Sequence, residues 1–193
     1  MRAIHGFATP DVFDPGSREM SAHRAEEFRR AMGRLPTGVA IVTASPDGIP
    51  VGMTIGTLTY VSSEPLMIIF FVQRTSARGR AIIDAERFAV NVLARNQSAE
   101  CLRFASSNGA KFEGLEFDAF TTGIPKIRGS VLWLEGHVSS VFDAGDHIGV
   151  LGLVDAFEAP PGHGQPLAFY RSKLASLNPA SGRHIPTEPL QWW

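Results

Sequence analysis

The sequence has a single cysteine, no long apolar run and almost no net charge, and each of these absences excludes a class of protein. With Cys101 alone, the chain can form no internal disulfide and no metal site built from several cysteines; one thiol fits a reducing cytoplasm. No apolar segment approaches the roughly 20 residues of a membrane-spanning helix. A net charge of −1 leaves no basic excess to follow a nucleic-acid backbone. We therefore expect a cytoplasmic protein without nucleic-acid or membrane partners.

Familiar catalytic and metal-binding motifs are also missing. The chain contains no G-x-S-x-G, no H-E-x-x-H, no phosphate-binding G-x-x-x-x-G-K-[ST], and no G-x-G-x-x-G after a strand. The histidines are dispersed, and Cys101 falls within a predicted helix beside Glu100 and Leu102. These patterns argue against a nucleophilic triad and a Rossmann dinucleotide site, and we expect no metal.

Composition and length indicate one globular domain. Hydrophobic residues make up 44% of the 193 positions and charged residues 19%, a mix far from that of disordered chains. Residues 1–20 hold prolines, glycines and scattered charge but no apolar signal core, so we expect an irregular arm and no secretory signal. The domain is expected over 21–177. The Pro-rich segment 178–193 is expected to be an irregular tail.

Local patterns predict short helices and strands. A first helix over 21–34, capped by Ser21, would place Ala25, Phe28, Met32 and Leu35 on one side. The turn at 45–48 joins a β-branched strand to its return strand over 48–63. Two further helices are expected over 75–85 and 96–105, the second capped by Asn96. The remaining strands are expected over 65–72, 88–94, 131–142, 147–157 and 166–171.

About seven strands with mostly short links, and no dominant helical period, favour a closed antiparallel barrel over a doubly wound sheet. The fold class is therefore mainly β with a few short helices. Segment 131–142 alternates, which predicts a half-buried strand with Glu135 and His137 on its polar side. Segments 65–72 and 147–157 are apolar on both faces, and burial of a second face in a subunit interface predicts a homodimer.

The segment 48–63 contains no group that is ionised at neutral pH, yet it carries Gly52, Thr54, Gly56 and Thr57, which fill a core poorly. Small residues let a flat ligand approach the backbone, whose N–H and C=O groups can then bind it. A flavin is such a ligand, because its pyrimidine edge offers carbonyls and an N–H. An ordinary Gly/Thr-rich barrel strand explains the same residues, and both interpretations remain open.

Two polar clusters are further candidates for ligand contacts. Residues 73–80 supply three arginines with Thr75 and Ser76 at a helix start, a combination that suits a phosphate, although these arginines can also simply solvate a helix. The pair Asp146–His147 precedes an apolar strand, where His147 could contact a ligand or transfer a proton. A turn in which Asp146 bonds nearby backbone groups is the alternative. Arg103 and Lys111 could also reach a phosphate.

The order of these segments resembles the flavin reductase domain family, the small reductase component of two-component flavin-dependent monooxygenases. The resemblance rests on P-T-G-V-x-x-V-T at 36–43, G-M-T at 52–54 and G-D-H at 145–147, with FAVNVLARNQ, KFEG and PLAFYR in the same order. It covers about 28–177. The chain departs from the family pattern at 55–58, where Ile-Gly-Thr-Leu replaces a Ser- or Ala-rich stretch, and before Leu66, where one proline replaces two.

The resemblance implies a homodimeric split β-barrel that binds FMN or FAD and oxidises NADH or NADPH. Residues 51–57 would run along the isoalloxazine ring, residues 73–78 would bind the ribityl phosphate, and His147 would lie on the nicotinamide side as the catalytic residue. The flavin and nicotinamide contacts implied in this way, together with the phosphate candidates above, are Met53, Thr54, Ile55, Gly56, Thr57, Phe71, Gln73, Arg74, Ser76, Arg78, Arg103, Phe104, Lys111, Phe169, Tyr170 and Arg171.

The activity implied by the resemblance is hydride transfer from the nicotinamide to the flavin, after which reduced flavin diffuses to a separate monooxygenase. No side chain need act as a nucleophile, and His147 would position the nicotinamide. Two alternatives share the fold: a non-catalytic flavin- or haem-binding protein, and an oxidase with bound FMN.

Overall fold

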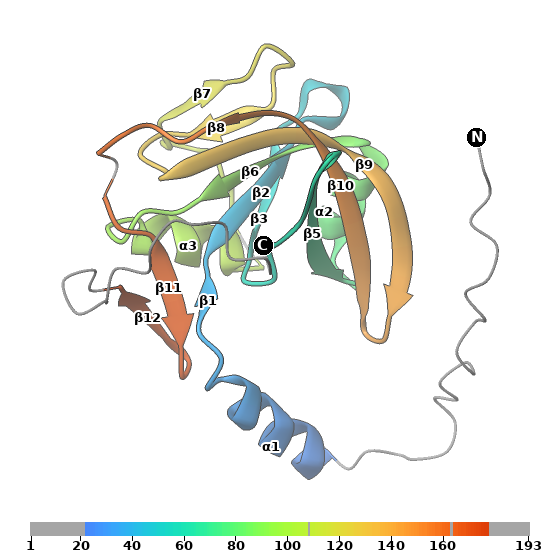
Figure 1. The fold of residues 1–193 in the computed structure, drawn as a ribbon, viewed down its shortest axis with the longest axis vertical. Coiled ribbons are helices and arrows are strands. Elements are labelled where there is room, and N and C mark those ends of the chain that lie inside the picture. The colour runs from blue at the N-terminus through green and yellow to red at the C-terminus, as the bar shows by residue number, and fades with distance from the viewer. Residues whose placement is uncertain (1–21, 108, 163, 178–193) are drawn as a thin grey trace.

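The computed structural model describes residues 22–107, 109–162 and 164–177. The predicted arm (1–20), the predicted cap Ser21 and the predicted tail (178–193) lie outside the described residues. The described chain is mainly β, with strands wrapped into a barrel and short helices at its margins (Figure 1). Among the helices of these ranges, none has the length and apolar character to cross a membrane.

A seven-stranded sheet, antiparallel at every pairing, forms the barrel. The sheet curls until its two ends approach each other. Thr57 follows one edge strand, and its hydroxyl accepts a hydrogen bond of 3.0 Å from the backbone N–H of Phe71 near the other edge. The predicted antiparallel barrel is confirmed. In spatial order its strands are β3 (Val51–Ile55), β2 (Ala40–Ala44), β6 (Arg87–Val92), β9 (Leu132–Ala144), β10 (His147–Glu158), β5 (Leu66–Gln73) and β4 (Thr59–Ser63).

Two smaller sheets and two of the three helices lie against the barrel. The three-stranded sheet consists of β1 (Thr37–Gly38), β11 (Leu167–Tyr170) and β12 (Lys173–Ser176), in that order. The two-stranded sheet is the hairpin of β7 (Phe117–Ala119) and β8 (Pro125–Ile127). The helices are α1 (Ala22–Met32), α2 (Ala77–Asp84) and α3 (Ser98–Ala105), with a 3₁₀ turn η1 (Pro46–Gly48) between β2 and β3. Strands β1, β7, β8 and β12 were not predicted from the sequence.

The core has two parts, which lie on opposite faces of β2. Val42 packs inside the barrel with Phe70 and Phe88, whose rings meet edge to face at 5.2 Å. Ile41, on the other face, packs in a second cluster with Phe104 of α3 and other side chains outside the barrel. The described residues cover the outer face of β5 less completely, since Met67, Ile69 and Phe71 are only half-buried. An apolar outer face on β5 therefore remains for a ligand or a second subunit.

The segment 48–63 forms two strands, so the predicted single return strand is wrong. The chain leaves β3 at Ile55, turns at 56–58 and begins β4, which pairs with β5 at the far end of the sheet. The pairing of β4 with β5 ends at Ile69, and beyond it the Thr57 hydroxyl bonds the backbone of Phe71. This segment closes the barrel because it joins its two edges.

Two further details differ from prediction. Glu135 is buried at 5% exposure, not on a polar face, and its carboxylate accepts a hydrogen bond from the hydroxyl of Thr122, which lies between β7 and β8. Helix α3 is preceded by Gln97, not capped by Asn96. The Gln97 side chain accepts from the Ala94 N–H at 2.9 Å and donates to the Arg128 carbonyl at 2.8 Å, so it ties two loops together.

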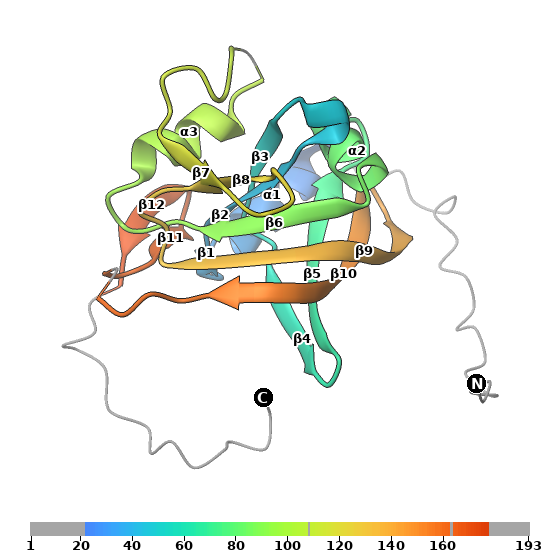
Figure 2. The ribbon, with the colours of Figure 1, turned by 90° about the horizontal axis from the view of Figure 1, so that it is seen from above.

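Two elements project from the barrel. Helix α1 stands apart from the sheet in Figure 1 and is tied to the β11–β12 turn by a 2.8 Å hydrogen bond from the Arg171 N–H to the Gly33 carbonyl. Its predicted apolar side is not covered, as Phe28 is 62% exposed and Met32 is 47% exposed. The β4–β5 hairpin projects from the barrel on another side in Figure 2.

Candidate functional site

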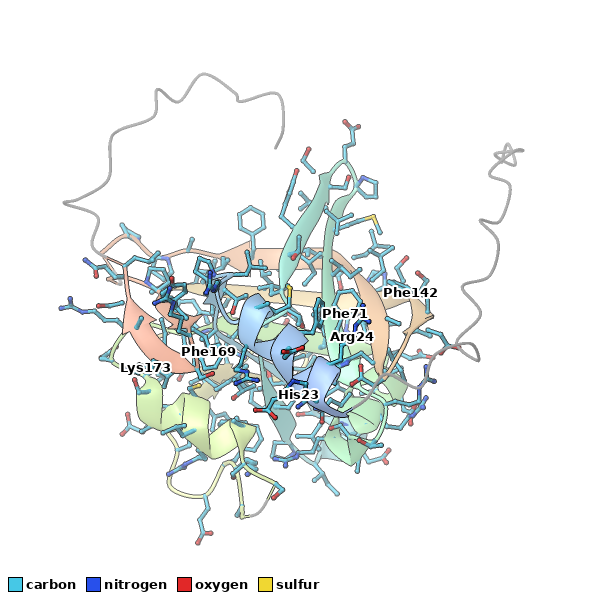
Figure 3. All side chains as sticks on the ribbon, turned by 90° about the horizontal axis from the view of Figure 1, so that it is seen from below. His23, Arg24, Phe71, Phe142, Phe169 and Lys173 are labelled. Carbon is cyan, nitrogen blue, oxygen red and sulfur yellow. The ribbon has the colours of Figure 1, made fainter. Side chains whose placement is uncertain are left out.

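A cavity of about 850 Å³ opens beside β3 and is bounded by β5, the start of α2, α3, β10 and the β11–β12 turn. These elements are far apart in sequence, and the curled sheet brings them together. In Figure 3, seen from below, α1 lies across this side of the molecule between Phe71 and Phe169, which both line the cavity. The predicted site residues that line it are Met53, Thr54, Ile55, Gly56, Thr57, Phe71, Gln73, Ser76, Arg78, Phe104, His147 and Phe169.

Strand β3 forms one wall and is an edge strand. Among the described residues it pairs with β2 on one side only, so alternate N–H and C=O groups point away from β2 without a strand partner there. A flat ligand whose rim carries both donors and acceptors can bond to such an edge as a further strand would. The pyrimidine edge of a flavin has this chemistry, so the wall fits the predicted isoalloxazine contact.

The two threonine hydroxyls of this wall are engaged by the protein. Thr54 donates to the carbonyl of Cys101 in α3 at 2.8 Å, which fixes α3 against β3. Thr57 bonds both the N–H and the carbonyl of Phe71 across the barrel closure, at 3.0 and 3.3 Å. Both hydroxyls hold the walls of the cavity together, and the backbone of β3 is the better candidate for direct ligand bonds.

Ser76 and Arg78 make the start of α2 a candidate anion site. The Ser76 hydroxyl caps the helix by accepting from the Gly79 N–H at 3.0 Å. Arg78 donates through Nη2 to the carbonyls of Ser106 and Ser107 at 2.7 and 3.1 Å. Its Nη1 is buried and has no hydrogen-bond partner among the described residues. A buried cationic donor without an acceptor is costly, and a phosphate oxygen at this helix terminus would satisfy it.

Lys111 and Arg103 lie near Arg78 at the C-terminal end of α3, where Arg78 and Lys111 both bond the Ser106 carbonyl. The Lys111 ammonium is buried and donates to the carbonyls of Arg103 and Ser106 at 2.8 and 2.9 Å. Burial lowers the pKa of the Lys111 ammonium below its ordinary value, and the positive charges of Arg78 and Arg103 lower it further. Arg103 donates to the Glu113 carbonyl at 2.9 Å. Both predicted ligands lie outside the cavity lining, where their charges favour an anion beside Arg78.

His147 enters the cavity from the first position of β10, opposite Gln73 of β5. Its Nδ1 lies 2.7 Å from Asp146 Oδ1. The hydrogen bond from His147 lowers the pKa of the Asp146 carboxyl below its ordinary value, the charge of His147 adds to this, and Arg29 of α1 contributes in the same direction. Asp146 is therefore an ionised acceptor at neutral pH, which leaves Nε2 of His147 for a ligand.

Three other predicted ligands lie outside the lining of this cavity. Arg74 directs its guanidinium to Asp143, and the Arg171 guanidinium lies over the Tyr170 ring at 5.3 Å. Arg171 has a left-handed backbone (φ 50°) in the β11–β12 turn that positions Phe169. For Arg74, Tyr170 and Arg171 the ligand role stays a prediction.

The cavity also has lining residues that the sequence analysis missed. Their common feature is position: most come from the cavity side of α3 or from the β11–β12 turn. The spacing of Cys101, Phe104 and Ala105 on α3 is a helical-face signal that could have identified part of this set. The missed residues are Val39, Cys101, Leu102, Ala105, Ser107, Ser172 and Leu174.

Comparison with known proteins gives consistent similarities. The family model of the flavin reductase like domain matches residues 32–178. The chain is 34% identical over 166 residues, 86% of each protein, to the reductase subunit HsaB of a flavin-dependent monooxygenase from Mycobacterium tuberculosis. Nitrilotriacetate monooxygenase component B from Mycobacterium thermoresistibile superimposes with a TM-score of 0.84 at 31% identity, over 88% of this chain and 96% of that one. The Streptomyces globisporus NADH:FAD oxidoreductase SgcE6, in complex with NAD and FAD fragments, gives 0.78 at 27% identity, over 83% and 96%.

Proposed function

Because the chain belongs to the flavin reductase like domain family, we propose that it is an NAD(P)H-dependent flavin reductase that reduces FAD or FMN and supplies the reduced flavin to a separate monooxygenase. The observation that carries the proposal is one cavity that combines the open edge of β3, the unpaired donor of Arg78 and the imidazole of His147. The names of HsaB, a reductase subunit, and SgcE6, an NADH:FAD oxidoreductase, support the same activity.

A bound flavin would supply the chemistry, since its ring accepts a hydride from a reduced nicotinamide. The chain binds and orients. The backbone edge of β3 bonds the pyrimidine side of the ring, and the apolar side chains of Met53, Ile55 and Phe104 exclude water from the cavity wall. Arg78 and the N-terminus of α2 hold the phosphate.

His147 binds and orients the nicotinamide dinucleotide through Nε2, since Nδ1 is occupied by Asp146. Holding the two cofactors in reach of each other would favour the transfer without a nucleophile from the protein. Flavin held by backbone groups and one arginine can leave after reduction, as delivery to a separate monooxygenase requires. We place this exchange in the cytoplasm, which the presence of one buried, unpaired cysteine, Cys101, supports.

The experiment that tests the proposal mixes the purified protein with NADH or NADPH and with FAD or FMN under air, in all four combinations, and follows the nicotinamide absorbance. Flavin-dependent loss of absorbance supports the reductase. A yellow protein that retains flavin on a column without oxidising either nicotinamide would indicate a binding protein. Substrate oxidation without any nicotinamide would indicate an oxidase. Either of the last two results contradicts the proposal.

We also propose that the protein is a homodimer. Exposed apolar side chains on α1, including Phe28 and Met32, and the half-buried outer face of β5 would be covered by a second copy. Sedimentation equilibrium at micromolar concentration should give twice the mass of the chain. Phe28→Ser should shift the protein toward monomer, whereas a wild-type protein that remains monomeric would contradict the assignment.

A further inference from the structure

Arg74 holds the turn between β9 and β10. It follows β5 directly, and the last residue of β5, Gln73, pairs with His147, the first residue of β10. The backbone N–H of Arg74 donates to the Asp146 carbonyl at 2.9 Å. Its Nη2 donates to Asp143 Oδ1 at 2.9 Å and to the Gly145 carbonyl at 3.3 Å. One residue therefore bonds the end of β9, the turn and the residue before β10.

These contacts commit the Arg74 guanidinium to the turn. Asp143 is its ionic partner, and the carbonyl of Gly145, which has φ +66°, is a second acceptor. Gly145 thus has the left-handed conformation that a tight turn requires. Both bonds use Nη2, so this end of the Arg74 guanidinium is held by the turn. Arg78 differs in that its Nη1 is buried and unpartnered within the described chain.

Asp146 fixes the imidazole from the other side. Its carboxylate lies 2.7 Å from Nδ1 of His147, while its side chain is 93% exposed. The Asp146 side chain therefore owes its position chiefly to its own backbone, which Arg74 anchors. Asp146 bonds the imidazole directly. Arg74 and Asp143 form an ion pair in the same hairpin, and Arg29 of α1 lies close enough to lower the pKa of the Asp146 carboxyl.

We propose that Arg74 and Asp146 are positioning residues for His147: Arg74 fixes the turn, and Asp146 keeps the proton on Nδ1 so that Nε2 accepts a hydrogen bond from the nicotinamide dinucleotide. This inference rests on the proposed function for the identity of the ligand only. It gives Arg74 a role other than the flavin-phosphate contact expected from the sequence. A carboxylate that holds the far nitrogen of a histidine sets both the tautomer and the ring orientation.

The direct test is the tautomer of His147. Long-range hydrogen–nitrogen-15 correlation spectra are recorded at about pH 8.5, where an ordinary imidazole is neutral, and the signals of His147 are assigned by their loss in His147→Ala. In the wild type Nδ1 should carry the proton. In Asp146→Asn the amide can donate to Nδ1 instead, so the tautomer protonated at Nε2 should gain population. Asp47→Asn, which changes another exposed turn aspartate outside the cavity, should leave the spectrum unchanged.

Steady-state kinetics provide the second test. Asp146→Asn and Arg74→Gln should each raise the KM for NADH by about five- to tenfold, with the dissociation constants of FMN, FAD and riboflavin unchanged. Arg95→Gln, an exposed arginine outside the cavity lining, is the matched control for Arg74. If Arg74→Gln instead weakens FMN and FAD but not riboflavin, Arg74 is a phosphate ligand and its positioning role is overturned.

The outcomes separate this inference from the proposed function. If the wild type oxidises no nicotinamide, the proposed function fails, but the tautomer measurement still decides whether Asp146 controls His147. If the wild type is active while Asp146→Asn keeps both the wild-type tautomer and the wild-type KM, the positioning role is wrong. Thermal unfolding of each variant identifies one that does not fold; should Arg74→Gln be such a variant, Arg74→Lys, which keeps the charge but not the fork, takes its place in the same assays.

Discussion

The ring of Phe104 lies directly over Gly52: a Cβ built on Gly52 would be 2.8 Å from Cε1 of the ring. Phe104 also packs edge to face on Phe112 at 5.1 Å, so the ring is held from a second side and cannot easily move away. This explains the glycine in the uncharged ribbon 48–63. Its smallness lets α3 approach β3, and the two elements then form one wall of the cavity.

Gly52→Ala should therefore lower the free energy of unfolding by about 1–3 kcal/mol, because the added methyl overpacks a full site. It should also weaken the binding of FMN, FAD and riboflavin, since displaced Phe104 would enter the cavity. Urea unfolding and flavin titration measure the two effects. Gly38→Ala is the control, because a methyl group added at Gly38 would have nothing within 4 Å and no change is expected. If Gly52→Ala keeps the stability of the wild type, the Phe104 ring moves away from the added methyl without cost, and the overpacking argument is wrong.

Arg78→Ala should weaken FMN and FAD by about tenfold to a hundredfold, the usual loss for a charge-assisted hydrogen bond. Riboflavin, which has no phosphate, should be affected far less. This comparison also corrects for any disturbance of α3 when the bonds to Ser106 and Ser107 are lost. An equal loss of affinity for the three flavins, measured by fluorescence quenching, would show that the phosphate does not bind at Arg78.

His147→Ala should raise the KM for NADH and slow flavin reduction by about tenfold, with flavin affinity nearly unchanged. The chain offers a matched control in His137, whose Nδ1 contacts Asp155 at 3.1 Å but which lies outside the cavity. His137→Ala should keep wild-type kinetics. Stopped-flow reduction under anaerobic conditions measures the step itself, and identical traces for wild type and His147→Ala would exclude His147 from the site.

The parts of this fold that sequence predicts are those set by local patterns. The apolar run 65–72 became β5, and the predicted small helix 75–85 is α2, which begins directly after Ser76. What failed depends on distant partners. Segment 48–63 forms two strands, with Thr57 bonded to Phe71 between them, and the buried Glu135 is bonded by Thr122. No periodicity within one segment contains these contacts.

The candidate site shows the same division. The resemblance and the residue chemistry pointed to the β3 ribbon, Arg78 and His147, all of which line one cavity. They also pointed to Arg74 and Lys111, which lie near it but use their charges on the turn and on the end of α3. A sequence shows which cations are available near a site, but only the fold shows which of them line the cavity and which of their donors are already bonded.

Substitutions at Thr54 test whether its hydroxyl supports the fold or binds the ligand. Thr54→Val keeps the shape of the side chain but removes the donor to the Cys101 carbonyl, so stability should fall by about 1 kcal/mol. Because the role of the bond is to hold α3 against β3, the three flavins should lose affinity together and modestly, and Thr54→Ser should restore both stability and binding. Calorimetric unfolding and flavin titration of the two variants provide the measurements. If Thr54→Val keeps the stability of the wild type but loses flavin affinity strongly, the hydroxyl leaves Cys101 for the ligand when flavin binds, and the backbone edge of β3 is then not the main contact.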